Sequence, residues 1–219
     1  MNRGKDRAGA RPSLQSRIPD GVPVVLVDSC VWHHSFSRNV LRHLALASAM
    51  RIRWSRAIES EWIASVLHAR PEITRDKLIE VRDRFRYEFP DGLVPESLPR
   101  LAVPRLPDPA DEHVVRAALV AEATIICTLD RRGFPRSTLA PLGVTVHDPA
   151  TLLANCISQR MRQTSAGLHA HRTSLTQPSY RPREYLDALK KAGLVQDTAI
   201  EELVMHGLKH AMSRAPAPK

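Results

Sequence analysis

The chain has 219 residues, 43% of them hydrophobic and 5% aromatic, which suits one domain with an aliphatic core and an appended segment. No apolar run approaches the roughly 20 residues that a membrane span needs, and the basic N-terminus lacks the apolar stretch of a secretory signal. We therefore expect a soluble, cytoplasmic protein with no membrane partner. Its three cysteines are predicted to be buried, reduced thiols: Cys30, Cys127 and Cys156.

The net charge of +9 indicates a polyanionic partner. The excess lies in the flanks, because residues 1–22 hold five Lys/Arg against two Asp, and residues 151–219 hold ten Lys/Arg against five Asp/Glu. The middle of the chain is nearly balanced. A charge that only aids solubility remains the alternative.

Apolar patterning predicts alternating strands and helices after the first 22 residues, which lack periodicity and are predicted to be a disordered basic leader. The expected elements are a buried strand over Val22–Val27, a helix over Val31–Ala49, a strand over Arg51–Trp54, a helix capped by Ser55, a charged helix from Pro71, a short edge strand over Leu101–Val103, a helix from Asp108 to Ala121, strands over Thr124–Thr128 and Val144–His147, and a helix from Asp148 to Gln159. This alternation predicts an α/β sandwich around a mostly parallel sheet.

The character of the sequence changes after residue 160. A polar stretch is predicted to be a connector, and two short helices follow it over Arg183–Ala192 and Thr198–Met212. The predicted organisation is a leader over 1–22, an α/β domain over 23–155 and a small C-terminal helical extension over 156–219.

Four acidic residues lie where predicted strands end or helices pass: Asp28, Glu61, Asp111 and Asp130. In a parallel sheet, ligands bind beyond the carboxyl ends of the strands. Two carboxylates about 4 Å apart repel by roughly 4 kcal/mol at an effective dielectric near 20, so a cluster of four is tolerable mainly with a divalent metal. Hard Mg²⁺ or Mn²⁺ suits such oxygen ligands. The pattern therefore predicts a metal-dependent nuclease.

Structural alternatives exist for each of these residues. Asp28 and Asp111 could serve as helix-terminal acids, Glu61 could lie on an exposed helix face and Asp130 could belong to a turn. Three neighbouring residues are expected to be ordinary ones: Glu59 solvated, Cys30 packed in the core and His113 a plain helix residue. The glycine-rich phosphate loops of Rossmann and P-loop folds are not found after any predicted strand.

Four segments, in this order and spacing, resemble the PIN-domain family: VLVDSCVW, RIRWSRAIESEWIASVL, LPDPADEHVVRAAL and IICTLDRRGFP. The closer similarity is to VapC-like toxins of type II toxin–antitoxin systems with a C-terminal helical extension. Asp28, Glu61, Asp111 and Asp130 match the four family acids, and Thr128 matches the small hydroxyl residue before the last one. The chain departs from relatives at Gly133, where a later acid is common, and at Arg38-Asn39, where Arg-Asp is typical.

The resemblance implies a PIN-like three-layer sandwich and a Mg²⁺- or Mn²⁺-dependent endoribonuclease. Asp28 and Asp111 would be the principal metal ligands, Glu61 and Asp130 would complete the shell directly or through water, and Thr128 or Ser29 would hydrogen-bond a phosphate. It also implies an RNA substrate, a cognate antitoxin protein and, as in many PIN toxins, a homodimer. Two alternatives stay open: a PIN nuclease of RNA processing or of defence against foreign nucleic acid, and a non-catalytic nucleic-acid or partner-binding module.

Overall fold

The computed structural model describes residues 21–95, 101 and 103–213, so the predicted leader lies almost entirely outside the described residues. In chain order the elements are β1 (Val24–Val27), α1 (Ser29–His33), α2 (Ser35–Leu46), β2 (Arg51–Arg53), α3 (Arg56–Ala69), α4 (Arg75–Glu88), η3 (Pro109–Asp111), α5 (Glu112–Val120), β3 (Ile125–Cys127), α6 (Arg136–Leu139), η4 (Ala140–Leu142), β4 (Thr145–His147), α7 (Pro149–Gln159), α8 (Met161–Ser174), α9 (Pro182–Lys191) and α10 (Thr198–Ser213).

The four strands form one sheet in the order β2-β1-β3-β4, and every neighbouring pair is parallel. The prediction of a mostly parallel sheet is therefore confirmed. β1 and β3 occupy the centre and are buried along their whole length, as their continuous apolar runs predict. Parallel pairing also brings the carboxyl ends of all four strands to one edge of the sheet.

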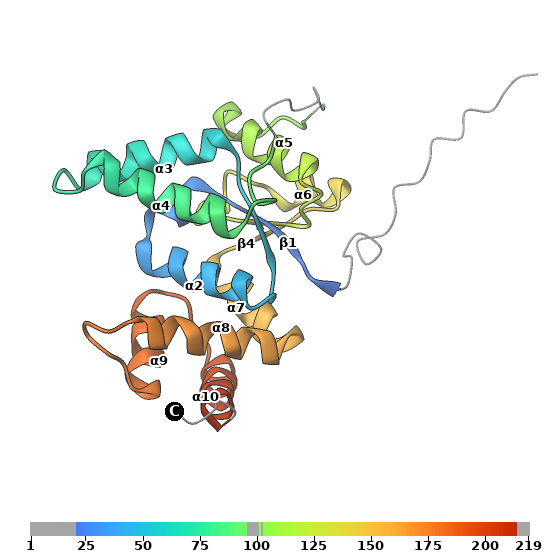
Figure 1. The fold of residues 1–219 in the computed structure, drawn as a ribbon. Coiled ribbons are helices and arrows are strands. Elements are labelled where there is room, and N and C mark those ends of the chain that lie inside the picture. Colours follow the sequence, from blue (N-terminus) through green and yellow to red (C-terminus); the bar gives the residue numbers. More distant parts are fainter. Residues whose placement is uncertain (1–20, 96–100, 102, 214–219) are drawn as a thin grey trace, which may run out of the picture.

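Helices cover both faces of the sheet, which gives the three layers of an α/β sandwich. Figure 1 shows α3, α4 and α5 on one side of the strands and α2 and α7 on the other, with α8, α9 and α10 gathered beyond α2 and α7. In the part of the chain that the structure describes, no helix combines the length and apolarity needed to cross a bilayer.

The single helix predicted over Val31–Ala49 is wrong, because the chain forms α1 and α2 with a break at His34. His34 has an extended backbone conformation, with φ −83° and ψ 101°. The indole of Trp32 donates to the carbonyl of Val27 over 3.0 Å, which anchors α1 under the first strand. Buried Arg38 then donates to the carbonyl of Trp32 over 2.7 Å and so terminates α1. The break thus lets the tryptophan enter the core.

Three predicted helix starts are confirmed. Ser55, Asp108 and Asp148 each accept a hydrogen bond from a backbone N–H in the first turn of the following helix. The charged helix begins at Arg75 rather than at Pro71, because Ile73 closes a turn onto the carbonyl of Arg70 over 2.9 Å. The predicted edge strand over Leu101–Val103 is absent at its first and last residues, the two that the structure describes.

The polar stretch after residue 160 is not a connector but the helix α8. Its buried face consists largely of small or polar residues, Thr164, Ser165, Gly167, Leu168 and His171. A Cβ at Gly167 would lie 2.7 Å from the carbonyl oxygen of His43, so α8 and α2 approach each other backbone to backbone. Such a contact needs no apolar stripe, which is why hydrophobic patterning missed this helix.

The two later helices agree with their predictions within one residue at each end. Their buried residues belong to the same hydrophobic cluster as the strands, and this shared cluster includes Leu168, Tyr185, Leu186, Leu189, Val204 and Leu208. The predicted domain boundary at residue 156 lies inside α7. The C-terminal helices and the sheet therefore share one continuous core.

Candidate active site at the carboxyl edge of the sheet

The neighbouring strands β1 and β3 place Asp28 and Thr128 side by side. The backbone N–H of Asp28 continues the strand ladder by donating to the carbonyl of Cys127 over 2.9 Å. The hydroxyl of Thr128, which is fully buried, donates to Oδ2 of Asp28 over 2.8 Å and accepts from the backbone N–H of Asp130 over 3.0 Å. Thr128 therefore links two of the predicted acids from within the core.

Asp28 is 7% exposed and caps α1. Besides Thr128, it accepts from the backbone N–H of Ser29 over 2.6 Å and from the thiol of Cys30 over 3.2 Å. These donors offset the cost of removing the carboxylate from water. The cap predicted as its alternative role is thus present, together with a set of hydrogen bonds that fixes the orientation of the carboxylate.

Cys30 remains a thiol at neutral pH. Burial raises the pKa of its thiol, and the nearby Asp28 carboxylate raises it further. Its sulfur also accepts from the backbone N–H of Leu129 over 3.2 Å. A raised pKa opposes nucleophilic chemistry, so the thiol acts here as a hydrogen-bond donor to Asp28.

Asp130 and Asp111 meet at Gly133. Oδ1 of Asp130 accepts from the backbone N–H groups of Arg132 and Gly133 over 3.1 and 3.2 Å, which forms the predicted turn. A Cβ on Gly133 would lie 2.7 Å from Oδ2 of Asp111 and 3.0 Å from Oδ2 of Asp130. Both carboxylates therefore border the same small space, which the missing side chain of Gly133 leaves open.

Asp111 ends η3, immediately before α5. Burial raises the pKa of its carboxyl group, and the carboxylates of Asp28, Asp108 and Asp130 raise it further. The contacts link the three acids in sequence: Thr128 joins Asp28 to Asp130, and the space at Gly133 lies between Asp130 and Asp111. Three separate segments of the chain thus place these carboxylates at the same edge.

Glu61 lies at the margin of this group on α3, with 42% of its side chain exposed. Its Oε1 is 2.7 Å from Nε2 of His113 on α5. Burial acts to raise the pKa of Glu61, but the hydrogen bond and charge of His113 and a hydrogen bond from Ser29 together lower it. The structure thus gives His113 a specific partner that the sequence did not suggest.

Glu59, expected to be solvated, is instead 4% exposed. It accepts from the indole of Trp54 over 2.8 Å and is paired with Arg86, whose Nε is 2.9 Å from Oε1. The prediction of a solvated Glu59 failed because helix periodicity does not reveal which polar side chain will meet a buried hydrogen-bond donor. Glu59 stabilises the packing of α3 on α4 and lies outside the acidic group.

The chemistry of the acidic group suits a hard divalent cation. Its donors are carboxylate oxygens, and in the described parts of the chain no Lys or Arg lies within ion-pair distance of Asp28, Asp111 or Asp130. Gly133 leaves room between two of the carboxylates. In the described residues, however, no three His, Cys, Asp or Glu side chains stand close enough together to hold a metal ion. Charge and donor type therefore fit Mg²⁺ or Mn²⁺, while the side chains are not gathered into a closed ligand set.

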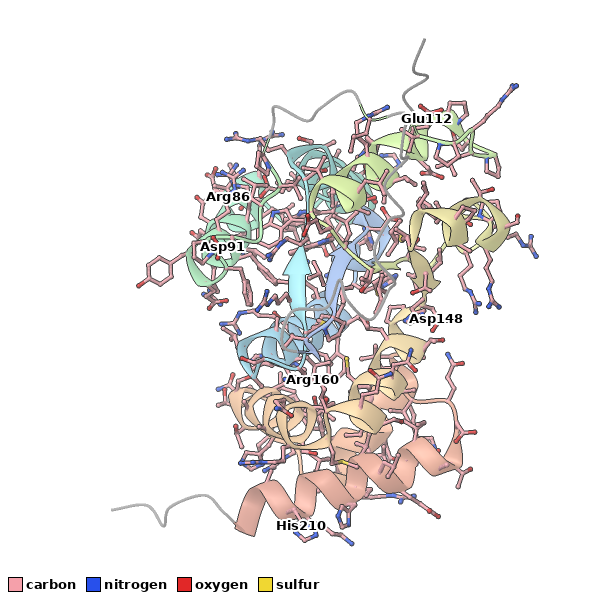
Figure 2. The ribbon with its side chains drawn as sticks, turned by 90° about the vertical axis from the view of Figure 1, so that its right-hand side faces the viewer. Arg86, Asp91, Glu112, Asp148, Arg160 and His210 are labelled. Carbon is pink, nitrogen blue, oxygen red and sulfur yellow. The ribbon has the colours of Figure 1, made fainter. Side chains whose placement is uncertain are left out.

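A separate cleft of about 620 Å³ runs along the edge strand β2, between α2 and the end of α4. Arg51, Arg53 and Asp91 line it, and none of the predicted site residues does. Figure 2 shows Asp91 on the opposite side of the molecule from Asp148, which follows β4 at the acidic edge. The cleft is therefore separate from the predicted acids.

Comparison with known proteins yields no match among protein-family profiles, curated proteins or solved structures. The α/β architecture and the grouping of the acids accordingly rest on the structure of this chain itself.

Proposed function

We propose that this protein is a metal-dependent endoribonuclease of the PIN-domain class. The proposal rests above all on one observation: Asp28, Asp111 and Asp130 converge from three separate segments at the carboxyl edge of a parallel sheet, with no paired Lys or Arg among the described residues. Such an arrangement raises the electrostatic energy of the metal-free protein, and a bound cation would lower it.

Asp28 and Asp111 would be the principal ligands of Mg²⁺ or Mn²⁺, with Asp130 and Glu61 contributing directly or through water. When bound, the cation would lower the pKa of a water molecule and neutralise charge on the phosphoryl oxygens during in-line attack. Thr128 orients Asp28 and Asp130 by its two hydrogen bonds. Ser29, next to Asp28, could hydrogen-bond a phosphate.

The loop after Asp130 supports a polyanionic substrate. Its three arginines, Arg131, Arg132 and Arg136, are all exposed, and Nη1 of Arg131 is 3.6 Å from Asp148 while its side chain is 63% exposed. Exposed guanidinium groups beside a negatively charged site can bind phosphates without closing the site. We propose single-stranded RNA as the substrate on this basis and on the net charge of +9.

The nuclease proposal is tested with the purified chain and RNA oligonucleotides. Cleavage should require added Mg²⁺ or Mn²⁺, stop on chelation and be absent from the Asp111→Asn variant. Binding of RNA without cleavage in either metal would instead favour the non-catalytic binding module. Cleavage that survives chelation would reject the metal site.

For its cellular role, we propose a VapC-like toxin of a type II toxin–antitoxin system. Induction of the chain alone should then arrest bacterial growth, whereas Asp111→Asn should not. Coexpression of the neighbouring gene product should restore growth, and that product should copurify as the antitoxin. A chain that cleaves RNA in vitro but is harmless when overproduced would keep the nuclease and favour RNA processing or defence.

A further inference from the structure

The pair of Glu61 and His113 joins two helices that otherwise pack on different neighbours. α3 lies against α1 and α4, whereas α5 lies against β1 and β3. Oε1 of Glu61 and Nε2 of His113 are 2.7 Å apart across this gap. The contact therefore couples the position of a carboxylate on one helix to the element that begins directly after Asp111.

Neither ring nitrogen of His113 is open to a substrate. Nε2 is engaged by Glu61, and Nδ1 is buried without a hydrogen-bond partner in the described structure. A buried polar atom left unpaired costs free energy. The imidazole thus keeps its position although the unpaired Nδ1 costs free energy. Among the described residues, its one polar contact is with Glu61.

Glu61, in contrast, would be free to move without its partner. Its side chain is 42% exposed, so in isolation it would sample many rotamers. The 2.7 Å contact with Nε2 of His113 restricts its carboxylate. The orientation of Glu61 relative to the acids is consequently set by His113.

We infer that His113 is a positioning residue, which acts through Glu61 by holding its carboxylate in one orientation beside Asp28 and Asp111. This role rests on the proposed nuclease function. Partners of this kind typically change activity or metal affinity 10- to 100-fold when removed, roughly. Because Glu61 lies at the margin of the acids, with Asp28 and Asp111 as the principal ligands, removal of His113 should slow turnover more than it weakens the binding of a divalent cation.

The test compares wild type with His113→Ala, His113→Gln, Glu61→Gln and the double variant Glu61→Gln/His113→Ala. Turnover and KM are measured on an RNA oligonucleotide with Mn²⁺, and Mn²⁺ binding to the metal-free chain is measured by calorimetry. His113→Ala should lower kcat about 10-fold, with KM and the Mn²⁺ dissociation constant changed far less. His113→Gln, whose amide can still donate to Glu61, should recover most of the turnover. The double variant should be no slower than Glu61→Gln alone.

A thermal melt of each metal-free variant separates positioning from simple stabilisation. Additive losses of turnover in the double variant, or a fall in melting temperature with unchanged kcat, would overturn the positioning role while leaving the nuclease intact. A wild-type chain that neither binds Mn²⁺ nor cleaves RNA would remove the proposed function and this inference with it.

Discussion

Thr128 donates its hydroxyl hydrogen to Asp28 over 2.8 Å, although 100 positions separate the two residues in the chain. The contact exists because β1 and β3 are parallel neighbours, so that the residues following them emerge at the same edge. The same oxygen accepts the backbone N–H of Asp130. One buried hydroxyl therefore links Asp28 to Asp130, and both residues are anchored by the strands that precede them.

Asp111→Asn should abolish RNA cleavage and weaken Mn²⁺ binding, yet it should preserve or raise the melting temperature of the metal-free protein. Burial and the neighbouring carboxylates raise the pKa of the Asp111 carboxyl group. The substitution removes the negative charge of this group, so repulsion in the folded state decreases. Thermal unfolding with and without Mn²⁺ measures both effects. Glu112→Gln is a matched control, because Glu112 is the next residue and has Arg116 within 3.9 Å. A large loss of metal-free stability in Asp111→Asn would contradict the repulsion argument.

Gly133→Ala should impair metal binding and cleavage while the fold persists. The new methyl group would lie 2.7 Å from Oδ2 of Asp111 and 3.0 Å from Oδ2 of Asp130, so those carboxylates must move apart or turn away. Calorimetry with Mn²⁺ and a cleavage assay report this change, and circular dichroism reports the fold. Arg132→Ala serves as the control, since it alters the preceding residue and leaves its backbone N–H bond to Asp130 possible. Full Mn²⁺ affinity in Gly133→Ala would show that the space plays no part.

Substitutions at Glu59 and Glu61 should differ in their effect on the free energy of unfolding, although only one residue separates them. Glu59→Ala should lower the free energy of unfolding by about 3–5 kcal/mol, because it leaves the buried indole N–H of Trp54 without its acceptor and breaks the pair with Arg86. Glu61→Gln, at an exposed pair, should change it by less than about 1 kcal/mol. Urea denaturation of both variants provides the comparison. Equal losses of unfolding free energy in the two variants would show that the buried contacts of Glu59 do not stabilise the fold.

The contact between α2 and α8 should weaken in acid. Burial, together with the nearby His43 and Arg42, lowers the pKa of His171 from its ordinary 6.5 to about 4. The unfolded chain then takes up this proton first, so the stabilisation is complete above about pH 6.5 and is lost as the pH falls toward about 4. At about 1.4 kcal/mol per pKa unit the loss is on the order of 3 kcal/mol.

The variant His171→Gln tests this pH dependence, since an amide can still hydrogen-bond the hydroxyl of Tyr185, which lies 2.7 Å from Nδ1 of His171. Its free energy of unfolding should fall less steeply than that of wild type between pH 6.5 and 4. His68→Gln, at an exposed position on α3, is the control. Parallel pH profiles for wild type and His171→Gln would assign the acid sensitivity to other groups.

Sequence patterning was sufficient to predict an element where burial gives that element an apolar run or an apolar face. The apolar runs of β1 and β3 and the caps at Ser55, Asp108 and Asp148 follow from rules that act within a few residues. The placement of Asp28 and Asp130 at one edge also followed, because parallel strands must end there. These features depend on local chemistry or on simple topology.

Pairings between distant polar groups could not be predicted in the same way. Glu59 and Glu61 have equivalent local surroundings in the sequence, and only the approach of α4 decides that Arg86 meets the first. Likewise, only the position of α3 gives His113 its contact with Glu61. The helix α8 was missed because its buried face includes Thr164, Ser165 and Gly167, which allow a close approach of the α8 and α2 backbones. Such a face has no hydrophobic periodicity.

The backbone contact of α8 with α2 has a practical consequence for dissecting this protein. Deleting residues beyond about 160 would remove basic side chains, but it would also strip Leu168 and Tyr185 from the core and expose the α2 face that Gly167 covers. Weaker RNA binding by such a shortened chain would then report unfolding as much as lost charge. Charge-neutralising substitutions at exposed Arg183 and Lys191, which leave the helices in place, measure the electrostatic contribution directly.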